Sequence, residues 1–201
     1  VNAAMALAAF SILLTAKKTD CLVSHNAPVS FKGMGKFDVL LPALCLFFVV
    51  IIRSFAGMTM GFAWKGEGYW GVAALAAVVL GKTAGGFAMD RIGGRPAALL
   101  SLTAAGVLFW FADSPYAGVA AIFLFNMSMP MTLCALARRM PGCKGFSFGL
   151  LTFALFLGFL PVGLGAVSSS PNWLLASLCA LSALLMLPGL DGRSVSLSHE
   201  S

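Results

Sequence analysis

Two basic side chains lie inside long apolar runs of the sequence, where a charge is costly. Arg53 falls within Val39–Trp64, about 21 Å along a helix that begins at Val39, and Lys82 falls within Tyr69–Met89. Ionisable residues in such segments usually bind a substrate, an ion or one another. Because no carboxylate accompanies either base inside these runs, we expect them to favour an anionic small molecule. A structural partner for Arg53, and a reach towards the membrane surface for Lys82, are the alternatives.

Polar residues alternate with methionines in two places. The run Asn126–Thr132 places Asn, Ser, Pro and Thr between three methionines, and the run Ser54–Gly61 is similar in composition. Asn126 and Thr59 are therefore candidate substrate-binding residues, because methionines provide an adaptable apolar wall that suits drug-like ligands. Packing between helices is an equal alternative for each residue.

Prolines and glycines mark where the apolar runs bend or pack closely. Pro130 and Pro161 are hinge candidates, because each lacks the N–H group that would continue a helix. Gly145 and Gly149 have the four-residue spacing that lets two membrane helices approach closely. We therefore expect both bends and close helix contacts in the second half of the chain.

The composition restricts the chain to a membrane. Of the 201 residues, 60% are hydrophobic and only 10% are charged, and the mean hydropathy is +0.95. A soluble domain has about 45–50% apolar and about 25% charged residues. This difference excludes a soluble enzyme, a disordered chain and a nucleic-acid-binding domain, so the net charge of +6 does not indicate a nucleic-acid partner.

The cysteines and histidines indicate no chemistry of their own. The five cysteines show no CxxC spacing and no neighbouring histidine, so we expect no metal site, no disulfide framework and no cofactor. The two histidines, His25 and His199, lie outside the apolar runs, which excludes a serine–histidine dyad within a membrane segment. We therefore expect no catalytic residues and no enzyme.

Seven apolar segments predict membrane spans. They cover Val1–Thr15, Val39–Trp64, Tyr69–Met89, Pro96–Phe111, Tyr116–Ala137, Phe146–Val167 and Trp173–Leu190. The expected organisation is a transmembrane helix at 1–16, a cytoplasmic linker at 17–37, six helices at 38–190 and a cytoplasmic tail at 191–201. The fold class is thus an all-α membrane protein.

The basic residues set the expected orientation. Ten of the thirteen lie in the linker, in alternate turns and in the tail, whereas the opposite turns hold only Lys65. Since cytoplasmic loops are enriched in Lys and Arg, we expect the linker and the C-terminus in the cytoplasm. Near the other helix ends lie the residues of an expected interfacial aromatic belt: Trp64, Tyr69, Trp70, Trp110, Tyr116 and Trp173.

The turn between the third and fourth segments reads GFAMDRIGGR from Gly86 to Arg95. Gly85 and Gly86 predict a close approach of two helices, and Gly93 predicts a tight turn. Asp90 can accept hydrogen bonds from a helix N-terminus or an arginine. The turn resembles the loop motif of the major facilitator superfamily, although Gly94 stands where that family usually has a basic residue. The matching positions are Gly86, Asp90, Arg91, Gly93 and Arg95.

This resemblance implies a place in a longer transporter. The family's motif lies between the second and third helices of each six-helix half and latches the outward-open state. Residues 1–16 would then be the last helix of the N-terminal half, and 38–190 would be the C-terminal half, built from two three-helix repeats. The missing N-terminal half would be a partner, and the protein would lie in the plasma membrane, with a bacterial inner membrane expected.

The implied function is secondary active transport of a small molecule by alternating access, in the direction of efflux, with proton coupling left open. The run Ile51–Ser54 resembles, more loosely, the fosmidomycin-resistance branch of efflux proteins, which implies export of drugs or phosphonates by proton antiport. A seven-helix receptor fits the number of segments, although the last segment has no lysine for retinal. That receptor and a non-transporting channel or scaffold are the alternative functions.

Overall fold

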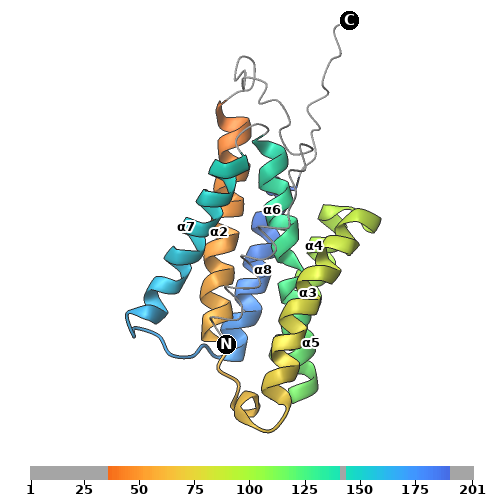
Figure 1. Ribbon diagram of the computed structural model, residues 1–201, viewed down its shortest axis with the longest axis vertical. Coiled ribbons are helices and arrows are strands. Elements are labelled where there is room, and N and C mark those ends of the chain that lie inside the picture. Colours follow the sequence, from red (N-terminus) through yellow and green to blue (C-terminus); the bar gives the residue numbers. More distant parts are fainter. Residues whose placement is uncertain (1–35, 141–143, 191–201) are drawn as a thin grey trace, which may run out of the picture. The chain divides into compact units, whose positions relative to one another are not determined.

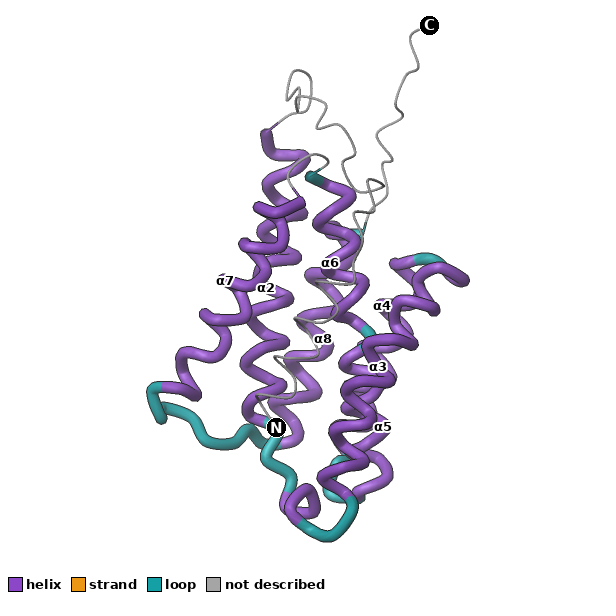
Figure 2. The backbone as a smooth tube through the Cα atoms, viewed as in Figure 1, coloured by secondary structure: helices purple, strands orange, loops and turns teal. Residues whose placement is uncertain are grey.

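The computed structural model describes residues 36–140 and 144–190, and these residues form helices and turns without a strand (Figures 1 and 2). The predicted span Val1–Thr15, nearly all of the linker and the tail at 191–201 lie outside the described residues. The helices are α2 (Lys36–Thr59), the short 3-10 helix η2 (Ala63–Gly66), α3 (Trp70–Ile92), α4 (Gly94–Trp110), α5 (Pro115–Asn126), α6 (Ser128–Arg139), α7 (Lys144–Gly163) and α8 (Asn172–Gly189).

Within the described residues, five segments are long and apolar enough to cross a membrane. They are Leu40–Thr59, Trp70–Ile92, Pro115–Arg139, Gly145–Gly163 and Asn172–Leu190. They indicate a multi-pass, all-helical membrane protein. The predicted span Pro96–Phe111 is not among them, because α4 has only 17 residues and a length of about 26 Å, shorter than the hydrocarbon core.

Helix α6 continues in the direction of α5, and the other consecutive long helices run in opposite directions, so this bundle has two distinct ends (Figure 1). One end carries Arg91, Arg95, Arg138 and Arg139, and we call it the arginine end. The other end carries η2 and the turns at 111–114 and 164–171, and we call it the η2 end. Helix α2 packs against α7 and α8, α4 packs against α8 and α5, and α3 packs against α5.

Glycines allow the closest of these contacts. A Cβ atom at Gly81 or Gly85 of α3 would overlap the carbonyl oxygen of Phe123 or Met127, respectively, where α5 and α6 meet. The close approach predicted at Gly85 is therefore confirmed. The close approach predicted at Gly86 is not seen, since no described residue has an atom within 4 Å of a Cβ placed there.

Three glycines of α7 also differ in whether they lie against a neighbouring helix. Gly158 of α7 lies against the backbone of α2, where a Cβ atom would overlap the carbonyl oxygen of Ile51. Beside it, the Oγ of Ser54 donates a hydrogen bond to the carbonyl of Leu155 at 2.7 Å. Gly145 and Gly149, which have the spacing of a close contact, have no described neighbour within 4 Å of a Cβ.

Trp64 of η2 is buried at the η2 end, which corrects its expected place in an interfacial belt. Its Nε1 donates to the carbonyl of Ala112 at 2.9 Å, and its ring stacks on Phe62 with centroids 5.3 Å apart. A Cβ atom at Gly118 would overlap the same ring. The indole therefore joins η2 to the α4–α5 turn. By contrast, four belt residues are exposed: Tyr69, Trp110, Tyr116 and Trp173.

Replacing Trp64 with phenylalanine should lower the apparent melting temperature of the detergent-purified protein by a few degrees. The change removes the hydrogen bond to Ala112, worth about 1 kcal/mol, and leaves part of a buried ring site unfilled. Trp110→Phe is the matched control, since Trp110 is exposed and should tolerate the change. Equal melting temperatures for native protein and Trp64→Phe would contradict a structural role for this indole.

Candidate functional site

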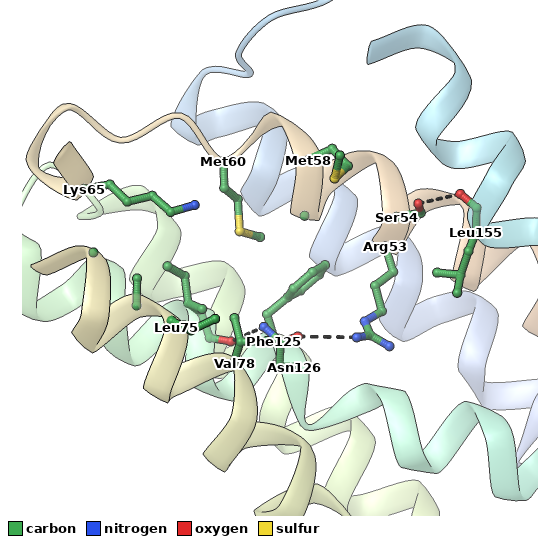
Figure 3. A pocket seen from close by; sticks show the side chains of 14 residues that line it. Arg53, Ser54, Met58, Met60, Lys65, Leu75, Val78, Phe125, Asn126 and Leu155 are labelled. Carbon is green, nitrogen blue, oxygen red and sulfur yellow. Dashed lines mark hydrogen bonds between the residues drawn. The ribbon is translucent and has the colours of Figure 1, made fainter. Parts of the chain in front are cut away.

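A cavity of about 440 Å³ lies between α2, α3 and α5, and its wall also includes residues of η2 and α7 (Figure 3). Ligand pockets in proteins commonly have about 300–1,000 Å³. Two of the four predicted substrate-binding residues, Arg53 and Asn126, line it together. Most of the remaining wall is apolar and includes Met58, Met60, Leu75, Val78, Phe125 and Leu155.

Arg53 lies within α2, six residues before the last residue of the helix, and is only 9% exposed. Its Nη2 donates to the Oδ1 of Asn126 at 3.4 Å, and its buried Nε has no partner among the described residues. A guanidinium carries five N–H donors and a charge, so a single long hydrogen bond compensates little of its burial. The described part of the cavity thus contains a cation without a matching anion.

Asn126 is held in place by the helix that carries it. It is the last residue of α5, and its Nδ2 donates to the carbonyl of Ile122 at 2.8 Å. This bond leaves Oδ1 as the acceptor that faces Arg53. The amide is therefore oriented by its own helix, and it in turn orients the guanidinium.

An interruption between α5 and α6 lies directly beside Asn126. The N–H of Met127 bonds to the carbonyl of Leu124, three residues back, at 3.2 Å. Pro130 lacks the N–H that would normally bond the carbonyl of Asn126. The helix is thus interrupted three residues before the predicted hinge at Pro130. Around the other hinge candidate, Pro161, α7 continues without interruption to Gly163.

Thr59 and Lys82 lie away from this cavity. Thr59 is fully buried, and its Oγ1 donates to the carbonyls of Phe55 and Ala56 in its own helix. Its carbonyl accepts a bond from the N–H of Ser170 at 3.0 Å, which ties the end of α2 to the turn before α8. Lys82 is exposed on α3 and does not line the cavity. The structure therefore does not bring Lys82 to Arg53.

One basic residue of the cavity wall was missed by sequence reasoning. Lys65 of η2 is exposed and lines the cavity at the η2 end. In Figure 3 it lies across the cavity from Arg53, with Met60 and Phe125 between them. The available signal was that Lys65 is the one basic residue in the turns on its side of the predicted membrane.

The loop motif forms the turn between α3 and α4 at the arginine end. Gly93 has a φ of 88°, a conformation that favours glycine, and its N–H donates to the carbonyl of Met89 at 3.1 Å. The predicted tight turn at Gly93 is therefore confirmed. The guanidinium of Arg91 lies over the ring of Phe87, 4.6 Å from its centroid. Asp90 is exposed and makes no hydrogen bond or ion pair within the described residues.

The described residues contain no group of three or more His, Cys, Asp or Glu side chains that could hold a metal ion. The site thus consists of one buried cation, one amide, one lysine at the η2 end and a largely apolar wall. Such a wall can bind an organic molecule, and the guanidinium can hold its charged or polar group.

Comparisons with protein-family models, with curated proteins and with solved structures found no match to this chain.

Proposed function

We propose that this chain belongs to a secondary active transporter, which moves a small molecule across a membrane by alternating access, and that the cavity is its binding site. The observation that carries the proposal is the position of Arg53. Its buried guanidinium has no anionic partner among the described residues and lines a cavity large enough for a ligand. The helix that carries it, α2, is long enough to span a membrane. Such a residue is costly unless it serves a pathway or a ligand.

The packing of the helices supports a half bundle of two three-helix repeats. One repeat would be α2, α3 and α4, and the other would be α5–α6, α7 and α8. In such repeats α2 would correspond to α5–α6, α3 to α7, and α4 to α8. The α2–α7 contact would then have its counterpart in the α5–α3 contact, and the α2–α8 contact in the α5–α4 contact. These are extensive contacts in the bundle, and α4 and α8, the third helices, pack on each other. Internal repeats of this kind are common in transporters.

The family proposed for the chain is the major facilitator superfamily, on the loop motif of Gly86, Asp90, Arg91, Gly93 and Arg95. The described helices would be the C-terminal half, joined through a cytoplasmic linker to an N-terminal half that completes the pathway. The direction would be efflux, across a bacterial inner membrane, with the C-terminus in the cytoplasm. Proton coupling would need a carboxylate in the other half, since the described acidic residues lie at helix ends and turns.

Alternating access can be tested without knowledge of the substrate. In a cysteine-free background, Met58→Cys in the complete gene product should react with a membrane-impermeant maleimide from both sides of sealed membrane vesicles. Met58 lines the cavity, and a transporter opens its cavity to each side in turn. Leu100→Cys on the outer face of α4 is the control and should react from neither side. Labelling of Met58→Cys from one side only would favour the receptor or scaffold alternatives.

The loop motif can be tested in the same vesicles. Asp90→Asn or Arg91→Ala should change the ratio of the two labelling rates of Met58→Cys by roughly tenfold, about 1.4 kcal/mol, because the motif would stabilise one of the two states. Arg138→Ala removes another exposed arginine at the same end, outside the motif, and should leave the ratio unchanged. If Arg138→Ala changed the ratio as much as Arg91→Ala, and Asp90→Asn changed it in the opposite direction, the arginine end would act through its general charge and not through the motif.

A further inference from the structure

We propose that the cavity selects an elongated amphipathic anion, with a carboxylate or phosphonate group on Arg53 and an apolar body between α2 and α3. This inference rests on the proposed function, because it names the substrate class of the same site. It depends on three observations: the unused donors of Arg53, the fixed orientation of Asn126 and the distribution of charge along the cavity wall.

The first observation is that Arg53 keeps most of its donors for a ligand. Among the described residues its only hydrogen bond is the 3.4 Å contact with Asn126, and its Nε–H is buried without a partner. The carboxylates whose side chains the structure describes, Glu67, Asp90 and Asp113, belong to turns and helix ends and not to the cavity wall. A planar guanidinium binds carboxylate and phosphonate oxygens through two parallel N–H bonds. A neutral or cationic ligand would leave this charge uncompensated.

The second observation is that Asn126 positions Arg53 without neutralising its charge. Its Nδ2 is used by the carbonyl of Ile122, and its Oδ1 is used by Arg53. An amide oxygen, unlike a carboxylate, accepts a hydrogen bond without neutralising the guanidinium. Asn126 therefore holds Arg53 in place while leaving its positive charge for another molecule.

The third observation is the length and composition of the cavity wall. Arg53 and Met60 both line the cavity, and the six residues of helix from Arg53 to the end of α2 correspond to about 9 Å. Figure 3 shows the side chains of Met60 and Phe125 between Arg53 and Lys65. The exposed Lys65 would raise the local concentration of anions at that end. An acid group at Arg53 with an apolar body of this length fits both the charge and the wall.

The charge preference can be measured with three ligands of one shape. Phenylbutyrate, phenylbutanamide and phenylbutylamine should be titrated calorimetrically into the detergent-purified complete gene product. Phenylbutyrate should bind roughly ten- to a hundredfold more tightly than the amide, the range expected for hydrogen bonds to a charged group. The protonated amine should bind more weakly still. Arg53→Gln should remove the preference for the acid, while Lys65→Gln should weaken phenylbutyrate binding only slightly and reduce its dependence on salt.

Equal affinity for the three ligands in the native protein, or an acid preference that persists in Arg53→Gln, would overturn the inference. The native protein alone decides the first point, so the test does not depend on the stability of a variant. Absence of binding by all three, with Met58→Cys still labelled from both sides, would reject this substrate class and leave transport standing. Arg53-dependent binding of phenylbutyrate, with labelling from one side only, would reject transport and support the anion site.

Discussion

Replacement of Gly85 by alanine should destabilise the protein strongly, whereas the same replacement at the adjacent Gly86 should not. A Cβ atom at Gly85 would overlap the carbonyl of Met127, so α3 would have to move away from the junction of α5 and α6. Overpacking of this kind costs about 1–3 kcal/mol. At Gly86 no described atom lies within 4 Å of a Cβ, and alanine is favoured over glycine in a helix by about 1 kcal/mol.

The two variants are a matched pair, since they differ by one position on the same helix. Their apparent melting temperatures in detergent should differ by several degrees, with Gly85→Ala below the native protein and Gly86→Ala equal to it or above it. The cavity should also respond, because Met127 follows Asn126 directly, and movement of this junction would displace the amide from Arg53. Equal melting temperatures for the two variants would show that α3 does not pack on α5 and α6 through Gly85.

The extent of the helices was largely predictable from hydropathy. The apolar runs Tyr69–Met89 and Trp173–Leu190 correspond closely to α3 and α8, because a membrane helix must be apolar along its whole length. Hydropathy predicts the end of a helix less accurately where the helix stops before the apolar run does. Helix α2 stops at Thr59 although the apolar run continues to Trp64, because Trp64 is held by the α4–α5 turn instead.

Contacts between helices were much harder to predict. The spacing of two glycines four residues apart occurs at Gly81 and Gly85 and again at Gly145 and Gly149, yet close packing on described residues is seen only for the first pair. This spacing of glycines indicates that another helix can approach closely, but it does not identify that helix. The partners are the carbonyls of Phe123 in α5 and of Met127 between α5 and α6, which are far from these glycines in the sequence.

The same limit applies to the candidate site. Arg53 and Lys82 both interrupt apolar runs, and the sequence makes both of them candidates for an anion site, with other roles left open. Arg53 turned out to be buried beside Asn126, while Lys82 is exposed on α3. Helices that are apolar on all sides give no periodic signal to separate a cavity-facing position from an outward one. Only the packing of α2 against its neighbours makes this distinction.

Replacement of Asn126 by aspartate should weaken the binding of anions strongly and make the unliganded protein more stable. The new carboxylate would take the place of the Oδ1 that faces Nη2 of Arg53 at 3.4 Å, and the guanidinium would gain a permanent counter-ion. Because Arg53 is already buried, the change adds a partner to an existing buried charge, a charge-assisted bond worth about 1.5–3 kcal/mol. An anionic ligand would then have to displace this carboxylate.

The expected result is a fall in phenylbutyrate affinity of about a hundredfold together with a higher apparent melting temperature. Asn126→Ala is the control, since it removes the acceptor without adding a charge and should lower both the affinity and the stability. A structural role for Asn126 alone would make both variants less stable. Native affinity in Asn126→Asp would mean that the acid group does not bind at Arg53. Opposite changes in stability and affinity, in contrast, would mean that an unpaired charge is retained in the cavity at a cost to stability because the substrate supplies its partner.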